Sequence, residues 1–119
     1  MKVIVAGCRY IDDYDVVAQA IKESGFKVTE VVSGRAKGVD KLGERWADHN
    51  KIPIKPFPAD WDKHGKAAGL IRNEEMARYA DALVAVWDGE SRGTLNMINT
   101  MGAVGKGNGT YVYMHGGKK

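Results

Sequence analysis

The feature that most constrains the fold of this chain is the regular alternation of short apolar runs with amphipathic segments. The run from Lys2 to Ala6 and the still more apolar run from Ala82 to Trp87 are typical of strands buried on both faces of a parallel sheet. Between such runs, apolar residues recur with helical spacing. The clearest case is Val39 to Ala47, opposite a charged face of Lys41, Glu44, Arg45 and Asp48. The alternation predicts an α/β fold with a mainly parallel sheet.

Capping and stop signals locate the remaining elements. A first helix is expected after the N-cap candidates Asp12 and Asp13, and Gly25 supplies its stop. Prolines in the segment 52–57 remove donors from the sheet ladder, which predicts a strand at the sheet edge. The expected strands are 2–6, 28–33, 52–57, 82–87 and 110–114; the expected helices lie around 16–21, 39–47, 68–80 and 94–104, with a loop over 61–65 and a loose tail over 116–119.

This element order predicts a Rossmann-like three-layer fold, with five strands in the order 3-2-1-4-5 and helices on both faces of the sheet. In such sheets, ligands bind outside the carboxyl ends of the strands, where the strand order reverses. Here that point lies between the first and fourth strands. The loops after the strands are therefore where functional residues are expected.

Length and composition narrow the class of protein. The chain of 119 residues suits one domain over 1–119, and no apolar run approaches the roughly 18 residues that span a bilayer. The single cysteine, Cys8, excludes an intramolecular disulfide and is typical of a reducing compartment, so we expect a cytoplasmic protein. The net charge of +3 favours anionic ligands slightly and does not indicate a nucleic-acid partner.

Glycine-containing loops follow the first and second strands. In the first loop a glycine permits close approach of the backbone to a ligand, and the adjacent arginine can grip a phosphate. The second loop, Ser-Gly-Arg-Ala-Lys-Gly-Val-Asp over 33–40, opens into a helix, which points free N–H groups and the positive end of the helix dipole at the top of the sheet. The alternative interpretation of this second loop is a simple turn with an N-cap. The spacing of its glycines matches neither the dinucleotide-binding motif nor the Walker motif. The candidate ligand-binding residues here are Gly7, Cys8, Arg9, Ser33, Gly34, Gly38 and Asp40.

The loop after the fourth strand carries the strongest local signal. The segment 88–94 again opens a helix, and its hydrogen-bond donors are denser than a bare connection needs. On the preceding helix, Asn73 occupies a stripe that is otherwise apolar, which suggests either a ligand contact or a clamp on a loop. The candidate ligand-binding residues here are Asn73, Asp88, Gly89, Ser91, Arg92, Gly93 and Thr94.

Other chemistry-bearing residues give weaker patterns. The histidines at 49, 64 and 115 lack metal-ligand spacing, so neither a metal nor a cofactor is expected. Cys8 beside Arg9 could be an activated nucleophile, but no histidine or carboxylate at a fixed spacing supports that role, which favours packing. Trp61 and Trp87 border the expected mouth of the site, where each can stack on a base or pack in the core.

Together these motifs resemble the SMF/DprA–LOG (SLOG) superfamily. The segments 7–9, 32–40, 72–73 and 91–94 are similar to those of its small stand-alone YspA-like, YpsA-related proteins of phages and bacteria. The resemblance covers residues 3 to about 101, nearly the whole chain. It implies a Rossmann-like fold that binds nucleotides or their derivatives.

One branch of the superfamily implies catalysis. The Lonely Guy (LOG) phosphoribohydrolases split the base from a nucleoside monophosphate, using an arginine on the helix before the fourth strand and a glutamate three residues after a Gly-Thr pair. By this resemblance Arg72 is the candidate catalytic residue, while Met97 stands where the glutamate is expected. Methionine cannot activate water, so Glu90, Asp88 or another acid would have to substitute.

Three functions follow in order of preference. The first is a binding or sensing module for a nucleotide-like small molecule, and the second is a LOG-like N-glycosidic enzyme. The third is a single-stranded nucleic-acid binder, as DprA is, which would require a basic groove with interleaved aromatics. For such a groove the chain offers only Trp61, Trp87 and scattered lysines, so nucleic acid is not expected as a partner. A membrane partner is not expected either. If the chain self-associates, we expect a homodimer.

Overall fold

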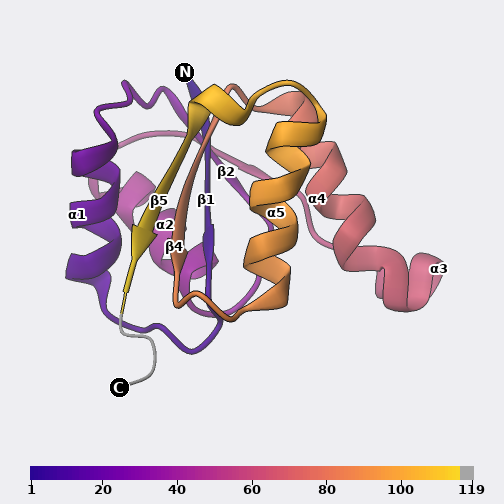
Figure 1. Ribbon diagram of the computed structural model, residues 1–119. Helices are drawn as coiled ribbons and strands as arrows, with labels where there is room; N and C mark the ends of the chain where they lie inside the picture. The colour runs from indigo at the N-terminus through magenta and orange to yellow at the C-terminus, as the bar shows by residue number, and fades with distance from the viewer. Residues whose placement is uncertain (116–119) are drawn as a thin grey trace.

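The computed structural model describes residues 1–115, so the tail expected over 116–119 lies outside the described residues. Five strands form one sheet in the order β3-β2-β1-β4-β5, and every neighbouring pair is parallel. The predicted strand order and the Rossmann-like α/β class are thereby confirmed (Figure 1). The strands are β1 (Lys2–Gly7), β2 (Glu30–Ser33), β3 (Ile54–Pro56), β4 (Ala82–Trp87) and β5 (Thr110–Met114).

Helices cover both faces of this sheet, as expected (Figure 1). Successive side chains of β1 point to opposite faces. Val3 and Val5 therefore pack on one side and Ile4 on the other. The first side is covered by α1 (Tyr14–Ser24) and α2 (Val39–His49), and the second by α4 (Ala68–Tyr79) and α5 (Arg92–Ala103).

Local sequence signals explain where these elements begin and end. The Asp13 carboxylate accepts hydrogen bonds from the first-turn N–H groups of α1, and Gly25 ends that helix with a φ of +74°. Central position explains the apolar run of β4, whose residues 82–86 are all buried. The proline-containing β3 is an edge strand, as predicted.

Several boundaries differ from the prediction. β2 and β3 are shorter than expected, and α5 begins at Arg92 rather than at Thr94. The expected loop over 61–65 contains α3 (Trp61–His64), followed by η1 (Gly65–Ala67), and a further short turn, η2 (Gly107–Gly109), precedes β5. These turns are too short to show a helical period in the sequence. In Figure 1, α3 projects from the body of the molecule.

Polar contacts tie α4 both to α5 and to the segment that follows α5. The side-chain amide of Asn73, on α4, donates to the Oδ1 of Asn96, on α5, at 2.8 Å. Beyond α5, the Lys106 ammonium donates to the carbonyls of Ala77, Arg78 and Ala80 at 2.9, 2.9 and 2.6 Å. These carbonyls lie at the C-terminal end of α4 and have no intrahelical partner there, so the lysine acts as a C-cap supplied from another element.

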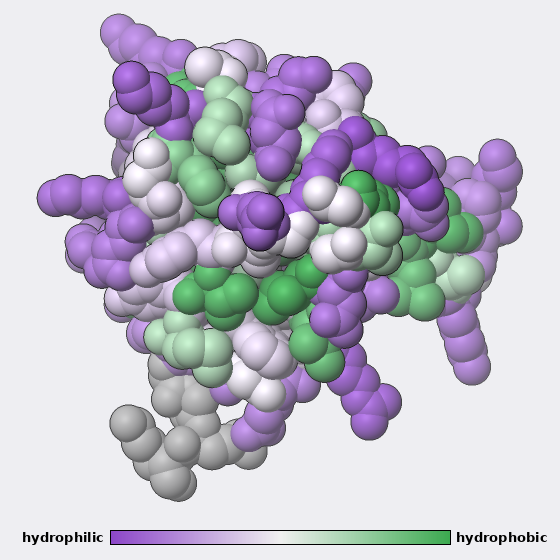
Figure 2. Space-filling model, turned by 45° about the horizontal axis from the view of Figure 1, so that its top comes forward, coloured by the Kyte–Doolittle hydropathy of each residue, from purple (hydrophilic) through white to green (hydrophobic). Residues whose placement is uncertain are grey.

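The exposed surface is mainly hydrophilic on the face drawn in Figure 2, where polar side chains surround small groups of apolar ones. Within residues 1–115, none of the helices combines the length and the apolar character needed to cross a bilayer.

Candidate functional site

A cavity of about 540 Å³ opens at the carboxyl ends of β1 and β4, where the strand order reverses. Its volume lies in the range usual for small-molecule sites. The loops after β1 and β4 contribute to its wall, together with α4 and the first turns of α5. The predicted site residues that line it are Gly7, Cys8, Arg9, Asp40, Arg72, Asn73, Asp88, Ser91, Gly93 and Thr94.

The first turn of α5 presents hydrogen-bond donors to this cavity. Ser91 is the N-cap, and its Oγ accepts from the Thr94 N–H at 3.4 Å. Gly93 is open, because a Cβ added there would meet nothing within 4 Å. The positive end of the helix dipole and the first-turn N–H groups make this position suited to an anion.

Asp88 shapes the loop before α5. Its Oδ1 accepts from the N–H groups of Glu90 and Ser91, each at 2.8 Å, and these hydrogen bonds hold the pKa of its carboxyl well below the usual range. The Tyr10 hydroxyl donates to the other carboxylate oxygen at 2.8 Å, and this bond raises the pKa of Tyr10 to about 12. Asp88 therefore organises the cavity rim through the backbone.

Arg72, on α4, lines the cavity and contacts the loop after β2. Its guanidinium donates to the Gly34 carbonyl, and its Nε donates to the Asn73 Oδ1 at 2.9 Å. Burial lowers the pKa of Arg72, while the nearby Asp40 raises it and Arg9 lowers it further. Asn73 in turn donates to Asn96 on α5, so its side chain joins two helices, whereas the sequence suggested a clamp on a loop. Its contact with a ligand stays a prediction.

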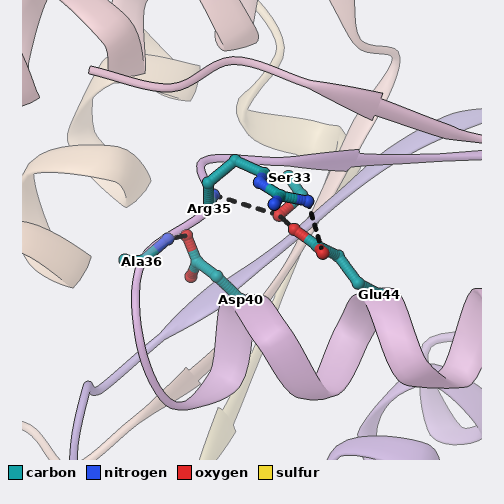
Figure 3. A network of polar contacts seen from close by, with 5 residues as sticks. All are labelled: Ser33, Arg35, Ala36, Asp40 and Glu44. Carbon is teal, nitrogen blue, oxygen red and sulfur yellow. Dashed lines mark hydrogen bonds and ion pairs between the residues drawn. The ribbon is translucent and has the colours of Figure 1, made fainter. Parts of the chain in front are cut away.

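A polar network under the loop after β2 is drawn in Figure 3. The Glu44 carboxylate accepts from the Ser33 hydroxyl at 2.6 Å and from the Arg35 guanidinium at 2.9 Å. Ser33 also accepts from the Arg35 N–H, so its buried side chain braces the loop and does not line the cavity. The assignment of Glu44 to the outer charged face of α2 was wrong, since its residue is only 9% exposed. Its polar partners lie on a separate strand and loop, which the helical period does not reveal.

Asp40 is the buried carboxylate of the cavity. It is 4% exposed, and its Oδ2 accepts from the Ala36 N–H at 3.3 Å. Burial raises the pKa of Asp40 to about 6, although hydrogen bonds from the Ala36 and Gly7 backbones and the charge of Arg72 oppose the rise. A carboxyl that titrates near neutral pH in a cavity can act as a proton acceptor or as a polar contact.

Two of the predicted glycines serve contacts within the protein. Gly38 has a φ of +77°, and a Cβ there would lie 2.4 Å from the Cys8 carbonyl oxygen. At Gly7 a Cβ would lie 2.2 Å from the Val86 carbonyl oxygen. Both glycines let backbones of neighbouring loops or strands meet. The predicted residues that do not line the 540 Å³ cavity are Ser33, Gly34, Gly38, Gly89 and Arg92.

The structure also locates the cysteine, two tryptophans and the methionine that the sequence singled out. Cys8 is 1% exposed and burial raises the pKa of its thiol, which disfavours a nucleophilic thiolate. Trp61 lines the cavity, whereas the Trp87 indole donates to the Ser91 carbonyl and the ring packs against the core. Met97, which stands where the sequence resemblance to LOG enzymes implies a glutamate, is buried and lines the cavity. Within residues 1–115, no group of histidine, cysteine and acidic side chains is arranged to hold a metal.

Several cavity residues were missed by sequence reasoning, among them Tyr10, Ala36, Lys66 and Leu70. They lie in loops or at helix starts where neither period nor motif marks a function. The signal that could have found Tyr10 is its place immediately after the Gly-Cys-Arg loop of β1.

Comparison with known proteins gives two matches. The model of a family described as "YspA, cpYpsA-related SLOG family" matches residues 1–64. The chain is also 35% identical over 103 residues to the Gene 61 protein of Mycobacterium phage D29, covering 78% of this chain and 82% of that protein. No solved structure matches significantly.

Proposed function

Because the chain belongs to the YspA, cpYpsA-related SLOG family, we propose that it binds a nucleotide or nucleotide derivative as a binding or sensing module. Family membership points to nucleotide-related binding or LOG-like activity in general terms. The observation that carries the narrower proposal is the arrangement of the 540 Å³ cavity. It brings the N-terminal turn of α5 and the cations Arg9 and Arg72 to one space at the point where the strand order reverses.

In this proposal a phosphate group sits at the start of α5. The N–H groups around Gly93 donate to its oxygens in the field of the helix dipole, together with one hydroxyl of the hydrogen-bonded pair Ser91 and Thr94. Arg72 supplies a charge-assisted contact, and its bond to the Gly34 carbonyl holds the guanidinium in place. The apolar floor around Met76 and Met97 and the exposed ring of Trp61 suit the ribose and base.

Isothermal titration with the four common nucleoside 5′-monophosphates tests the proposal. Arg72→Ala should weaken binding about tenfold to a hundredfold, because a hydrogen bond to a charged group is worth roughly 1.5–3 kcal/mol. The matched control is Arg78→Ala on the same helix, because Arg78 is exposed, pairs with Glu74 and does not line the cavity. Equal affinity of both variants, or no binding of any monophosphate by the unmodified protein, would contradict the proposal.

One observation favours a second candidate function, cleavage of the N-glycosidic bond of a nucleoside monophosphate. Asp40 lines the cavity near Arg72 with a pKa raised to about 6, so it is a more suitable substitute acid than the exposed Glu90. Long incubation with nucleoside monophosphates, followed by chromatography of free bases, distinguishes the two functions. If the unmodified protein releases the base and Asp40→Asn does not, the protein is an enzyme and the proposal of a binding module is wrong. Without base release, Met97→Glu is the variant to test for gained activity.

A further inference from the structure

A second cavity, of about 450 Å³, adjoins the first on the side of β2 and β3. Arg9, Ala36, Trp61 and Arg72 line both cavities, so the two spaces share a wall. The second cavity is lined by the loop after β2, over 34–37, and by Pro58, Ala59 and Trp61 from the segment after β3.

The charge of this second cavity differs from that of the first. Its lining has four cationic side chains, Arg9, Arg35, Lys37 and Arg72, and among the described residues no acidic side chain lines it. The first cavity, in contrast, contains the carboxyl groups of Asp40, Asp88 and Glu90. The second cavity is therefore the more electropositive of the two.

Only part of this positive charge is balanced within the protein. Glu44 pairs with Arg35 at 2.9 Å and so holds that guanidinium at the cavity wall. Across residues 1–115, the side chains of Arg9 and Lys37 make no hydrogen bond or ion pair. Arg9 and Arg72 lie close enough that the charge of Arg9 lowers the pKa of Arg72, and an anion beside both would relieve this repulsion.

The spacing of the two anion positions limits the kind of ligand. The start of α5 follows β4, whereas Lys37 follows β2, and β1 lies between these strands. Neighbouring strands lie about 4.8 Å apart, so the strands that lead to the two positions are roughly 10 Å apart, and the long side chain of Lys37 can shorten the gap that a ligand has to span. A diphosphate, in which one oxygen joins the two phosphorus atoms, is much shorter than the distance between these strands.

We propose that the second cavity binds a second phosphate group, on the far side of the nucleoside from the first, so that the preferred ligand is a 5′-phosphorylated dinucleotide or a similar nucleotide with two separated phosphates. This inference rests on the proposed function, since it takes the first phosphate to lie at the start of α5. The nucleoside then spans the shared wall, with Trp61 beside it and with Arg9 and Arg72 between the two phosphates.

Titration calorimetry with two matched probes tests the inference: the four nucleoside 5′-monophosphates and the corresponding 5′-phosphorylated dinucleotides. The dinucleotide should bind the unmodified protein about tenfold more tightly than its monophosphate, as expected for one added charge-assisted contact. Lys37→Ala should remove this advantage and leave monophosphate affinity within about twofold. Lys37 is exposed and lines only the second cavity, so its loss should not affect the fold.

Lys41→Ala is the matched control, because it removes the same charge from an exposed position that lines neither cavity. It should leave both affinities unchanged. Equal binding of monophosphate and dinucleotide would overturn this inference alone, and so would equal losses in both lysine variants. Affinity that keeps rising steeply for ten-residue oligonucleotides would instead indicate a nucleic-acid groove and would also overturn it. Failure of every nucleotide to bind would overturn the proposed function with it.

Discussion

Replacing Asp40 by asparagine should change the pH dependence of folding stability by an amount that follows from its burial. The pKa of Asp40 is raised from 3.8 to about 6, with burial as the main cause. Its folded-state carboxyl therefore keeps its proton up to about pH 6, whereas the unfolded chain releases it near pH 4. Stability contributed by the protonated form is present below pH 4 and is lost as the pH rises toward 6. With 1.36 kcal/mol per pKa unit, the loss between pH 4 and pH 7 is about 2 to 3 kcal/mol.

Urea unfolding of the unmodified protein and of Asp40→Asn, at half-unit steps from pH 4 to pH 7, measures this effect. Asparagine does not titrate, so any cost of its own geometry is the same at every pH. The free energy of unfolding of the unmodified protein should fall by about 2 to 3 kcal/mol relative to the variant across this range. A difference that stays constant with pH would refute the reasoning, because it would mean that Asp40 has a normal pKa in the folded protein.

Three further predictions concern the loops and the ligand. Gly93→Asp should abolish nucleotide binding in calorimetry, since it places a carboxylate at the start of α5. Circular dichroism should show an intact fold, because a Cβ at this position meets nothing within 4 Å. Unchanged binding would mean that the phosphate binds elsewhere. Gly38→Ala should lower the free energy of unfolding by more than about 2 kcal/mol, because the position combines a φ of +77° with a clash against the Cys8 carbonyl, and a loss below about 0.5 kcal/mol would contradict this. Single-stranded DNA should bind only loosely and with a simple salt dependence in fluorescence anisotropy, whereas tight binding at physiological salt would favour the nucleic-acid hypothesis.

The strand order could be predicted because the sequence distinguishes central from edge strands. A strand buried on both faces must be apolar throughout, and 82–86 is the clearest such run, while prolines exclude 53–56 from a central position. The position of the site then follows from topology, since the order reverses between β1 and β4. The cavity does lie there, and the two loops predicted to carry chemistry after those strands both contribute to it.

Other features of the site could not be predicted, for identifiable physical reasons. A glycine in a loop is needed equally where a ligand approaches and where another backbone approaches, and Gly38 proves to be the second case. Glu44 fits the polar side of a helix by its spacing, but its partners Ser33 and Arg35 come from another element. The second cavity depends on how the segment after β3 folds back against the loop after β2, and periodicity carries no information about such loop packing.

The polar contacts between α4 and α5 affect how much conformational entropy the protein would lose when a ligand binds. Arg72 lies on α4 and Thr94 on α5, and the Asn73–Asn96 bond and the Lys106 cap hold these helices together on either side of their packed interface. These contacts restrain the separation of the two walls in the folded chain. A ligand that bridged them would meet pre-organised groups. The protein would then lose little further conformational freedom on binding, and more of the contact energy would be retained as affinity. Ligands of different length would then be distinguished by how well they match the distance between α4 and α5.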